Sequence, residues 1–171
     1  MTEVILVNDN DEVVGTMEKL QAHKEGRLHR AFSVFIINEN KQLLLQQRAS
    51  HKYHSAGLWS NACCSHPLPE ESIQEAAIRR VKEELGICVT NLTNMFSFKY
   101  KSDLENNLTE HELDHVLLAH YNGSPEINID EVSDWKYFSM AEIKNMLHIH
   151  PEQFTVWFKL ILPKIEHYFT L

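Results

Sequence analysis

Long apolar runs are absent from this sequence of 171 residues: no stretch approaches the roughly 20 apolar residues that a membrane-spanning helix requires. The opening Met1-Thr2-Glu3 is not part of a basic segment followed by an apolar one, which is the pattern of a secretory signal. The sequence therefore predicts a soluble, cytoplasmic protein with no membrane partner.

Cysteine is also scarce, and the pattern of the cysteines argues against a disulfide framework. Cys63, Cys64 and Cys88 are an odd number, and two adjacent cysteines are poorly placed to bridge each other. We therefore expect free thiols in a reducing compartment, with Cys63 and Cys88 as buried structural thiols.

Positive charge is in deficit, because 16 Lys and Arg face 24 Asp and Glu, giving a formal net charge of −8. The basic residues are scattered, so the sequence predicts no nucleic-acid partner. An anionic ligand would need a local basic cluster or a metal ion to overcome the overall field. Histidine, in contrast, is abundant: 11 residues raise the expectation of metal or proton chemistry.

The hydrophobic pattern predicts one α/β domain over residues 1–171, which we expect to be a monomer. Hydrophobic residues make up 43% of the chain, enough for one core, and no linker or repeat is evident. Alternating and β-rich runs predict strands, and the period changes to that of a helix after Pro69. The predicted strands are 4–7, 13–17, 31–37, 42–48, 89–100, 113–121 and 134–138, and the predicted helices are 69–86, 140–147 and 152–169.

The predicted helix 69–86 carries a spaced set of charged residues. With its flanks it resembles the Nudix box, which reads G-x5-E-x7-R-E-U-x-E-E-x-G-U with U apolar. The matching residues are Glu71, Arg79, Val81, Glu83, Glu84, Gly86 and Ile87. Carboxylates one turn from an arginine can present a hard cation to a diphosphate. The resemblance implies an α/β fold: a Nudix-type sandwich of mixed β-sheets flanked by helices.

Two positions depart from the box. Ser65 replaces the first glycine, and Arg80 replaces the glutamate after the arginine, a position important in hydrolytic Nudix enzymes. The second substitution argues against pyrophosphate hydrolysis.

Four further motifs lie outside this helix, at 20–23, 27–33, 59–67 and 109–113. Together with the box, they resemble the type I isopentenyl-diphosphate isomerases, a diverged branch of the Nudix superfamily. The resemblance runs from Leu6 to about Trp157. It implies the reversible conversion of isopentenyl diphosphate into dimethylallyl diphosphate, with a small-molecule prenyl diphosphate as the partner.

The resemblance also implies a metal centre formed by His23, His29, His66, Glu110 and Glu112. Imidazole nitrogens favour borderline metals, so this centre suits Zn²⁺, Mn²⁺ or Fe²⁺ better than Ca²⁺, and Zn²⁺ or Mn²⁺ is the expected occupant. In an extended chain, residues two apart share a face, so Cys64 would accompany His66, and Glu110 would accompany Glu112.

The catalytic residues that the resemblance implies are Cys64 and Glu112, on opposite faces of the substrate, with Tyr100 as the hydrogen-bonding neighbour of Glu112. Moving a double bond requires adding one proton and removing another, so an acid and a base are both needed. Trp157 would offer its π face to the developing cation, although simple core packing is the alternative reading.

Phosphate contacts are implied for Lys19, Arg48, Lys52 and Arg80. Glu84 would hold a Mg²⁺ ion that accompanies the substrate, with help from the backbone carbonyl of Cys64.

Three other interpretations compete with this one. His111, Glu112 and His115 satisfy the H-E-x-x-H signature of metalloproteases, but the surrounding residues favour a strand, so we expect neither histidine to bind metal. A Nudix hydrolase of a nucleoside diphosphate derivative is the second. A module holding structural zinc through Cys63, Cys64 and His66 is the third, although adjacent cysteines lack the usual spacing.

Overall fold

A computed structural model describes residues 1–169 of the chain. Its strands are β1 (Glu3–Val7), β2 (Val13–Glu18), β3 (His29–Ile37), β4 (Leu43–Arg48), β5 (Trp59–Ser60), β6 (Cys63–Ser65), β7 (Thr93–Asp103), β8 (Thr109–His120) and β9 (Val132–Phe138). Its α-helices are α1 (Lys19–Glu25), α2 (Ile73–Leu85), α3 (Met140–Ile149) and α4 (Val156–Ile165). Short 3₁₀ helices lie at Glu105–Asn107, Pro151–Gln153 and Glu166–Tyr168. Within residues 1–169, no helix combines the length and the apolar character that a membrane crossing demands.

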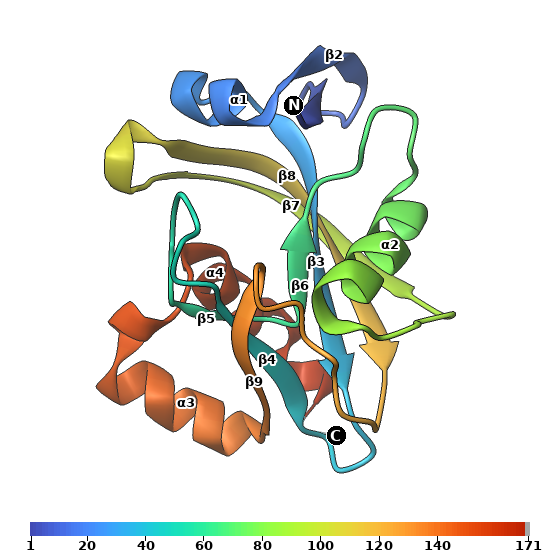
Figure 1. Cartoon of the computed structure of the whole chain (residues 1–171), viewed down its shortest axis with the longest axis vertical. Helices are drawn as coiled ribbons and strands as arrows, with labels where there is room; N and C mark the ends of the chain where they lie inside the picture. Colours follow the sequence, from blue (N-terminus) through green and yellow to red (C-terminus); the bar gives the residue numbers. More distant parts are fainter. Residues whose placement is uncertain (170–171) are drawn as a thin grey trace.

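Strand β3 lies at the centre of the sheet (Figure 1). It pairs in parallel with β8 and antiparallel with β1, β4 and β6, so the sheet is mixed. The register places His29 beside Glu112 of β8 and Ser33 beside Cys64 of β6. One strand therefore aligns two segments that lie almost 50 residues apart in the chain.

Alternating apolar residues of β3 contribute side chains to the hydrophobic clusters on both faces of the sheet. Val34 and Ile36 pack in a cluster with Ala77 and Val81 of α2. Residues of opposite parity, such as Phe35, join a second cluster with α3 and α4. Since successive side chains of a strand point to opposite faces, helices cover the sheet on both sides (Figure 1). This arrangement confirms the predicted α/β fold.

The Nudix-like helix begins later than the predicted 69–86. Glu70 has a left-handed backbone (φ 69°), and the helix starts only after Ser72. The Ser72 hydroxyl accepts a hydrogen bond from the backbone N–H of Glu75, and the Glu75 carboxylate accepts one from the backbone N–H of Ser72, which forms a capping box. Gly86 ends the helix at φ 68°, where a Cβ atom would lie 2.8 Å from the carbonyl oxygen of Glu126. Glycine is thus required at this position of the box.

Other predicted boundaries were wrong. Helix α1 was missed, as were the short strands β5 and β6, and β8 begins at Thr109 rather than at residue 113. The predicted helix 152–169 is divided, because Thr155 caps a separate α4 that contains Pro163. Cys63 is buried as expected, but Cys88 is exposed, which contradicts its interpretation as a buried thiol.

Candidate active site

A pocket of about 570 Å³, counting its open mouth, lies where β6, β8 and α2 approach one another. Most of the predicted site residues line it: Lys19, Arg48, Lys52, Cys64, His66, Arg80, Glu84, Glu110, Glu112 and Trp157. The remaining three, His23, His29 and Tyr100, lie behind the wall in contact with its carboxylates. The fold thus brings all the predicted site residues into one region.

The buried histidines present lone pairs toward the pocket. His23 donates through Nδ1 to the carbonyl oxygen of Lys19 (2.7 Å), and His29 donates through Nδ1 to that of Arg27 (2.8 Å). Because a carbonyl oxygen only accepts, each ring in its neutral form carries the proton on Nδ1 and leaves Nε2 as an acceptor. A backbone partner on the far nitrogen is the usual arrangement of a metal-binding histidine.

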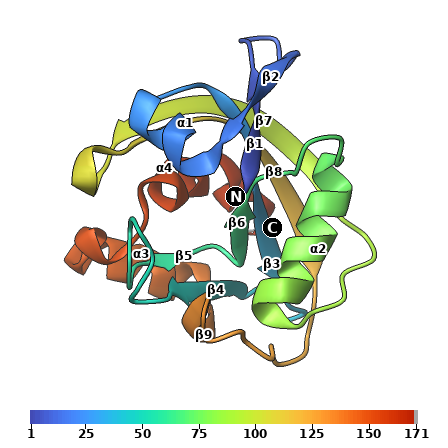
Figure 2. The same ribbon diagram turned by 45° about the horizontal axis from the view of Figure 1, so that its top comes forward.

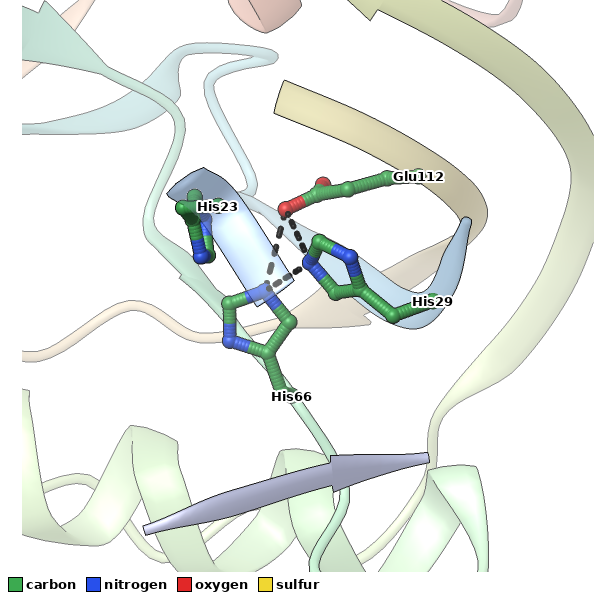
Figure 3. A group of neighbouring side chains, drawn as sticks. All are labelled: His23, His29, His66 and Glu112. Carbon is green, nitrogen blue, oxygen red and sulfur yellow. Dashed lines mark hydrogen bonds and ion pairs between the residues drawn. The ribbon is translucent and has the colours of Figure 1, made fainter. Parts of the chain in front are cut away.

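The Nε2 atom of His29 lies close to His66 Nε2 and to a carboxylate oxygen of Glu112 (Figure 3). His29 Nε2 lies 3.2 Å from His66 Nε2 and 3.5 Å from Glu112 Oε1, and His66 Nε2 lies 3.0 Å from the same oxygen. His23 Nε2 and Glu110 Oε2 are buried and have no hydrogen-bond partner. A cation would satisfy all of these atoms together, and imidazole with carboxylate suits a borderline divalent metal. The four residues drawn in Figure 3 could therefore hold a metal ion.

The two buried carboxylates of β8 influence each other. Burial and the neighbouring Glu112 charge raise the pKa of Glu110. Burial acts to raise the pKa of Glu112 as well, but its interactions with Glu110 and His29 lower it overall. Tyr100, whose pKa burial raises well above its usual value, donates its O–H to Glu112 Oε2 at 3.0 Å. Glu112 is therefore an ionised carboxylate with a fixed orientation.

The thiol of Cys64 is held on the other side of β3. Trp157 Nε1 donates to Sγ at 2.9 Å, and the thiol donates to Asn61 Oδ1 at 3.0 Å. Asn61 is itself fixed, because its amide nitrogen donates to the carbonyl oxygens of Val34 and Cys63. Burial raises the pKa of Cys64 to about 12, so its proton is retained. The site thus combines a protonated thiol with an ionised carboxylate.

Positive charge gathers at the α2 side of the pocket. Arg80 donates to Glu84 at 2.6 Å, and Lys52 forms an ion pair with Glu131. The Arg48 guanidinium lies over the Trp157 ring, 5.3 Å from its centroid. Burial lowers the pKa of Lys19, and repulsion from Lys52, Arg80 and Arg48 lowers it further. Four cations around one cavity form the local basic cluster that an anionic ligand requires.

Sequence reasoning missed several residues of this site. Asn61 and Gln46 orient Cys64 and Glu84, Glu131 pairs with Lys52, and Ser33 donates to the buried Asp114. His54 lies 3.2 Å from Glu110, and burial lowers its pKa to about 3. These residues lie in loops or at single strand positions, and only Asn61 and Ser33 fall within motifs that were recognised.

The structural-zinc interpretation fails on geometry. Cys63 and Cys64 are successive residues of β6 and point to opposite faces. Cys63 belongs to the apolar cluster beneath α2, whereas Cys64 and His66 line the pocket. The three side chains therefore do not share a site.

Residues 111 and 115 both lie on strand β8, although the predicted strand began only at residue 113, and not on the helix that a metalloprotease signature needs. His111 bonds to the carbonyl oxygen of Gly26, and His115 bonds to Asp11. Because odd-numbered residues of β8 face away from Glu110 and Glu112, we predict that His111→Ala and His115→Ala keep the metal content of the parent protein. Elemental analysis checks this, with His66→Ala as the comparison that loses metal; loss in both test variants would contradict the prediction.

Comparison with known proteins agrees with this architecture. Residues 27–158 match the NUDIX domain. The solved structure of DR0079 from Deinococcus radiodurans superposes with a TM-score of 0.72 at 20% sequence identity, covering 86% of this chain and 90% of that one. The chain therefore belongs to the NUDIX domain family.

Two curated relatives narrow the class. The isopentenyl-diphosphate delta-isomerase of Pectobacterium atrosepticum is 52% identical over 98% of this chain and 93% of its own length. Isopentenyl-diphosphate delta-isomerase 1 of Aromatoleum aromaticum is 45% identical over 95% and 92%. Within the NUDIX domain family, the chain belongs to the isopentenyl-diphosphate delta-isomerases.

Proposed function

We propose that this enzyme interconverts isopentenyl diphosphate and dimethylallyl diphosphate, a reaction of isoprenoid biosynthesis, by transferring protons at two carbons. The observation that carries the proposal is the pairing of the Cys64 thiol and the Glu112 carboxylate in one pocket. Family membership favours isomerisation over hydrolysis of a nucleoside diphosphate derivative.

Cys64 and Glu112 have complementary protonation states. Shifting the double bond adds a proton to the terminal carbon and removes one from the carbon nearer the diphosphate. In the direction from isopentenyl to dimethylallyl diphosphate, the thiol supplies the first proton and the carboxylate accepts the second. The reverse reaction exchanges these two roles. Tyr100 steadies the Glu112 carboxylate through its 3.0 Å hydrogen bond.

Trp157 lies beside the thiol and is almost fully buried. Its indole N–H donates a hydrogen bond to the Cys64 sulfur, and its ring forms an apolar part of the pocket wall. Proton addition to an alkene creates positive charge on carbon, which an aromatic face stabilises. Excluding water from this wall protects such a cation from capture.

His23, His29, His66, Glu110 and Glu112 would hold the resident metal, for which Zn²⁺ or Mn²⁺ suits the donor set. When bound, the ion would supply a fixed positive charge that orders these ligands and sets the basicity of Glu112. Glu84, 5% exposed at the cationic end, would hold a Mg²⁺ ion delivered with the diphosphate, together with the Cys64 carbonyl.

Lys19, Arg48, Lys52 and Arg80 would neutralise the diphosphate. Lys19→Ala removes one charge-assisted contact, so we expect KM to rise by about 10-fold or more while kcat changes little. Lys24→Ala, an exposed lysine of the same helix, is the matched control. Steady-state kinetics with isopentenyl diphosphate measures both constants. Equal constants for Lys19→Ala and the parent enzyme would remove Lys19 from the binding site.

The proposed activity also favours a location in the cytoplasm. A catalytic thiol stays reduced in the cytoplasm, which supports a cytoplasmic enzyme. We propose a single-domain monomer that acts on a small-molecule prenyl diphosphate, because this chain itself supplies both proton-transfer groups and the cationic cluster.

Proton NMR of the enzyme with isopentenyl diphosphate and Mg²⁺ in D₂O tests the function. Isomerisation by exchangeable groups carries deuterium into dimethylallyl diphosphate, and ³¹P spectra then show neither phosphate nor pyrophosphate release. Release of either anion without double-bond migration would instead support a hydrolase.

A further inference from the structure

His54 is a buried imidazole at the edge of the metal centre, and the family resemblance gave it no role. It lies in the loop that joins β4 to β5, with only 5% of its surface exposed. Its Nε2 atom lies 3.2 Å from Glu110 Oε1 and its ring stacks beside that of His23, with centroids 5.6 Å apart. Two imidazoles therefore approach the same carboxylate.

The loop holds this ring firmly. His54 Nδ1 contacts Ser55 Oγ at 3.2 Å, and Arg48 donates to the His54 carbonyl oxygen at 3.2 Å. Ser55 has a left-handed backbone (φ 50°), and its N–H donates to Glu105. A non-glycine residue adopts this conformation at a cost that surrounding contacts must offset. The loop is thus shaped to direct the His54 ring inward.

A hydrogen bond from His54 to Glu110 does not give every buried polar atom of His23, His54 and Glu110 a partner. It would occupy one carboxylate oxygen, but His23 Nε2 and Glu110 Oε2 would remain buried without partners. The ligand atoms of His23, His54 and Glu110 all lie within 4.8 Å of one another. Buried acceptors this close together suit a cation bound between them.

We propose that His54 is a further ligand of the metal centre and binds the same divalent ion as His23 and Glu110. The candidate donors form two groups that share His23, one with His29, His66 and Glu112 and one with His54 and Glu110, and within each group the ligand atoms lie within 4.8 Å of one another. One ion bound by both groups would have four imidazole and two carboxylate donors, the number that an octahedral shell takes. Octahedral donors at bonds of about 2.1 Å lie about 3 Å from their neighbours. The separations of 3.0 to 3.5 Å along the chain of contacts from Glu112 through His66 to His29, and from Glu110 to His23 and His54, match that spacing.

The inference rests on the metal centre of the proposed function, but metal binding is measured without any prenyl diphosphate. Apo-protein is titrated with zinc against a competing chelator. We expect His54→Ala to bind at least about 10-fold more weakly than the parent protein, and His54→Gln to bind similarly weakly. His51→Ala, an exposed histidine of the same loop, is the matched control and should keep the parent affinity.

Cobalt substitution counts the ligands directly. Each metal-bound imidazole with a ring N–H gives one hyperfine-shifted proton signal that disappears in D₂O. We expect four such signals in the parent protein and in His51→Ala, and three in His54→Ala or His54→Gln. Circular dichroism of the apo forms checks that each variant folds, and the glutamine variant keeps the volume of the site.

Three signals in the parent protein, or unchanged zinc affinity in both His54 variants, would overturn the proposal. Four signals in a parent protein that fails to isomerise its substrate would instead uphold the ligand and refute the proposed function. The two failures are therefore distinguishable.

Discussion

Replacing Cys64 by alanine is expected to reduce kcat for isomerisation by about 1000-fold or more. The thiol is the only group of the described residues that we assign to proton transfer on its side of β3, and positioned proton transfer contributes about 10²- to 10⁴-fold to rate. The D₂O assay reports both the rate and the deuterium incorporated. The fold should persist, because the change removes one sulfur atom at the pocket wall.

Cys88→Ala is the control for Cys64→Ala, because Cys88 is exposed and lies outside the pocket lining. It should keep parental activity. Substantial turnover by a correctly folded Cys64→Ala enzyme would exclude the thiol as the proton donor and would assign that step to another pocket residue.

The second large effect is expected for Glu112→Gln. Its carboxylate touches His66, His29 and Tyr100, so the amide should weaken metal binding and also abolish proton acceptance. We expect Glu112→Gln to bind metal more weakly. Its kcat should also remain about 1000-fold lower than that of the parent enzyme when excess metal saturates the site. Activity and metal content measured on the same samples separate the two effects.

Glu110→Gln provides the comparison for Glu112→Gln. Glu110 contacts His23 and His54 and is assigned only to metal binding, so its variant should regain much of its activity when metal saturates the site. If Glu112→Gln recovered activity in the same way, Glu112 would be a ligand alone and the base would be a different group.

The sheet and the Nudix-like helix were predictable because their apolar residues follow regular periods. Helix α1 was not, since its buried positions include His23, where a core helix would carry an apolar side chain. The start of β8 was lost for the same reason: Glu110 and Glu112 are buried carboxylates. Binary patterning fails where a functional site places polar groups inside the protein.

The motifs were enough to predict most residues of the candidate site. The residues that sequence reasoning missed are brought to the site by tertiary packing. Separated motifs in order indicated which histidines and carboxylates to expect together. His54 lies in a loop without ligand spacing, and its approach to Glu110 depends on how that loop folds over α1. Figure 2 shows α1 beside the start of β8, a contact between segments more than 80 residues apart. One sequence contains no local signal of such a neighbour.

The pairing of β3 with both β6 and β8 limits how this enzyme can change in length. Ser33 is aligned with Cys64 and His29 with Glu112, and a strand that gains or loses one residue turns every following side chain to the other face. An insertion between His29 and Ser33 would therefore uncouple the two halves of the reaction centre. Length variation among homologues should accumulate in connecting loops and spare these few positions.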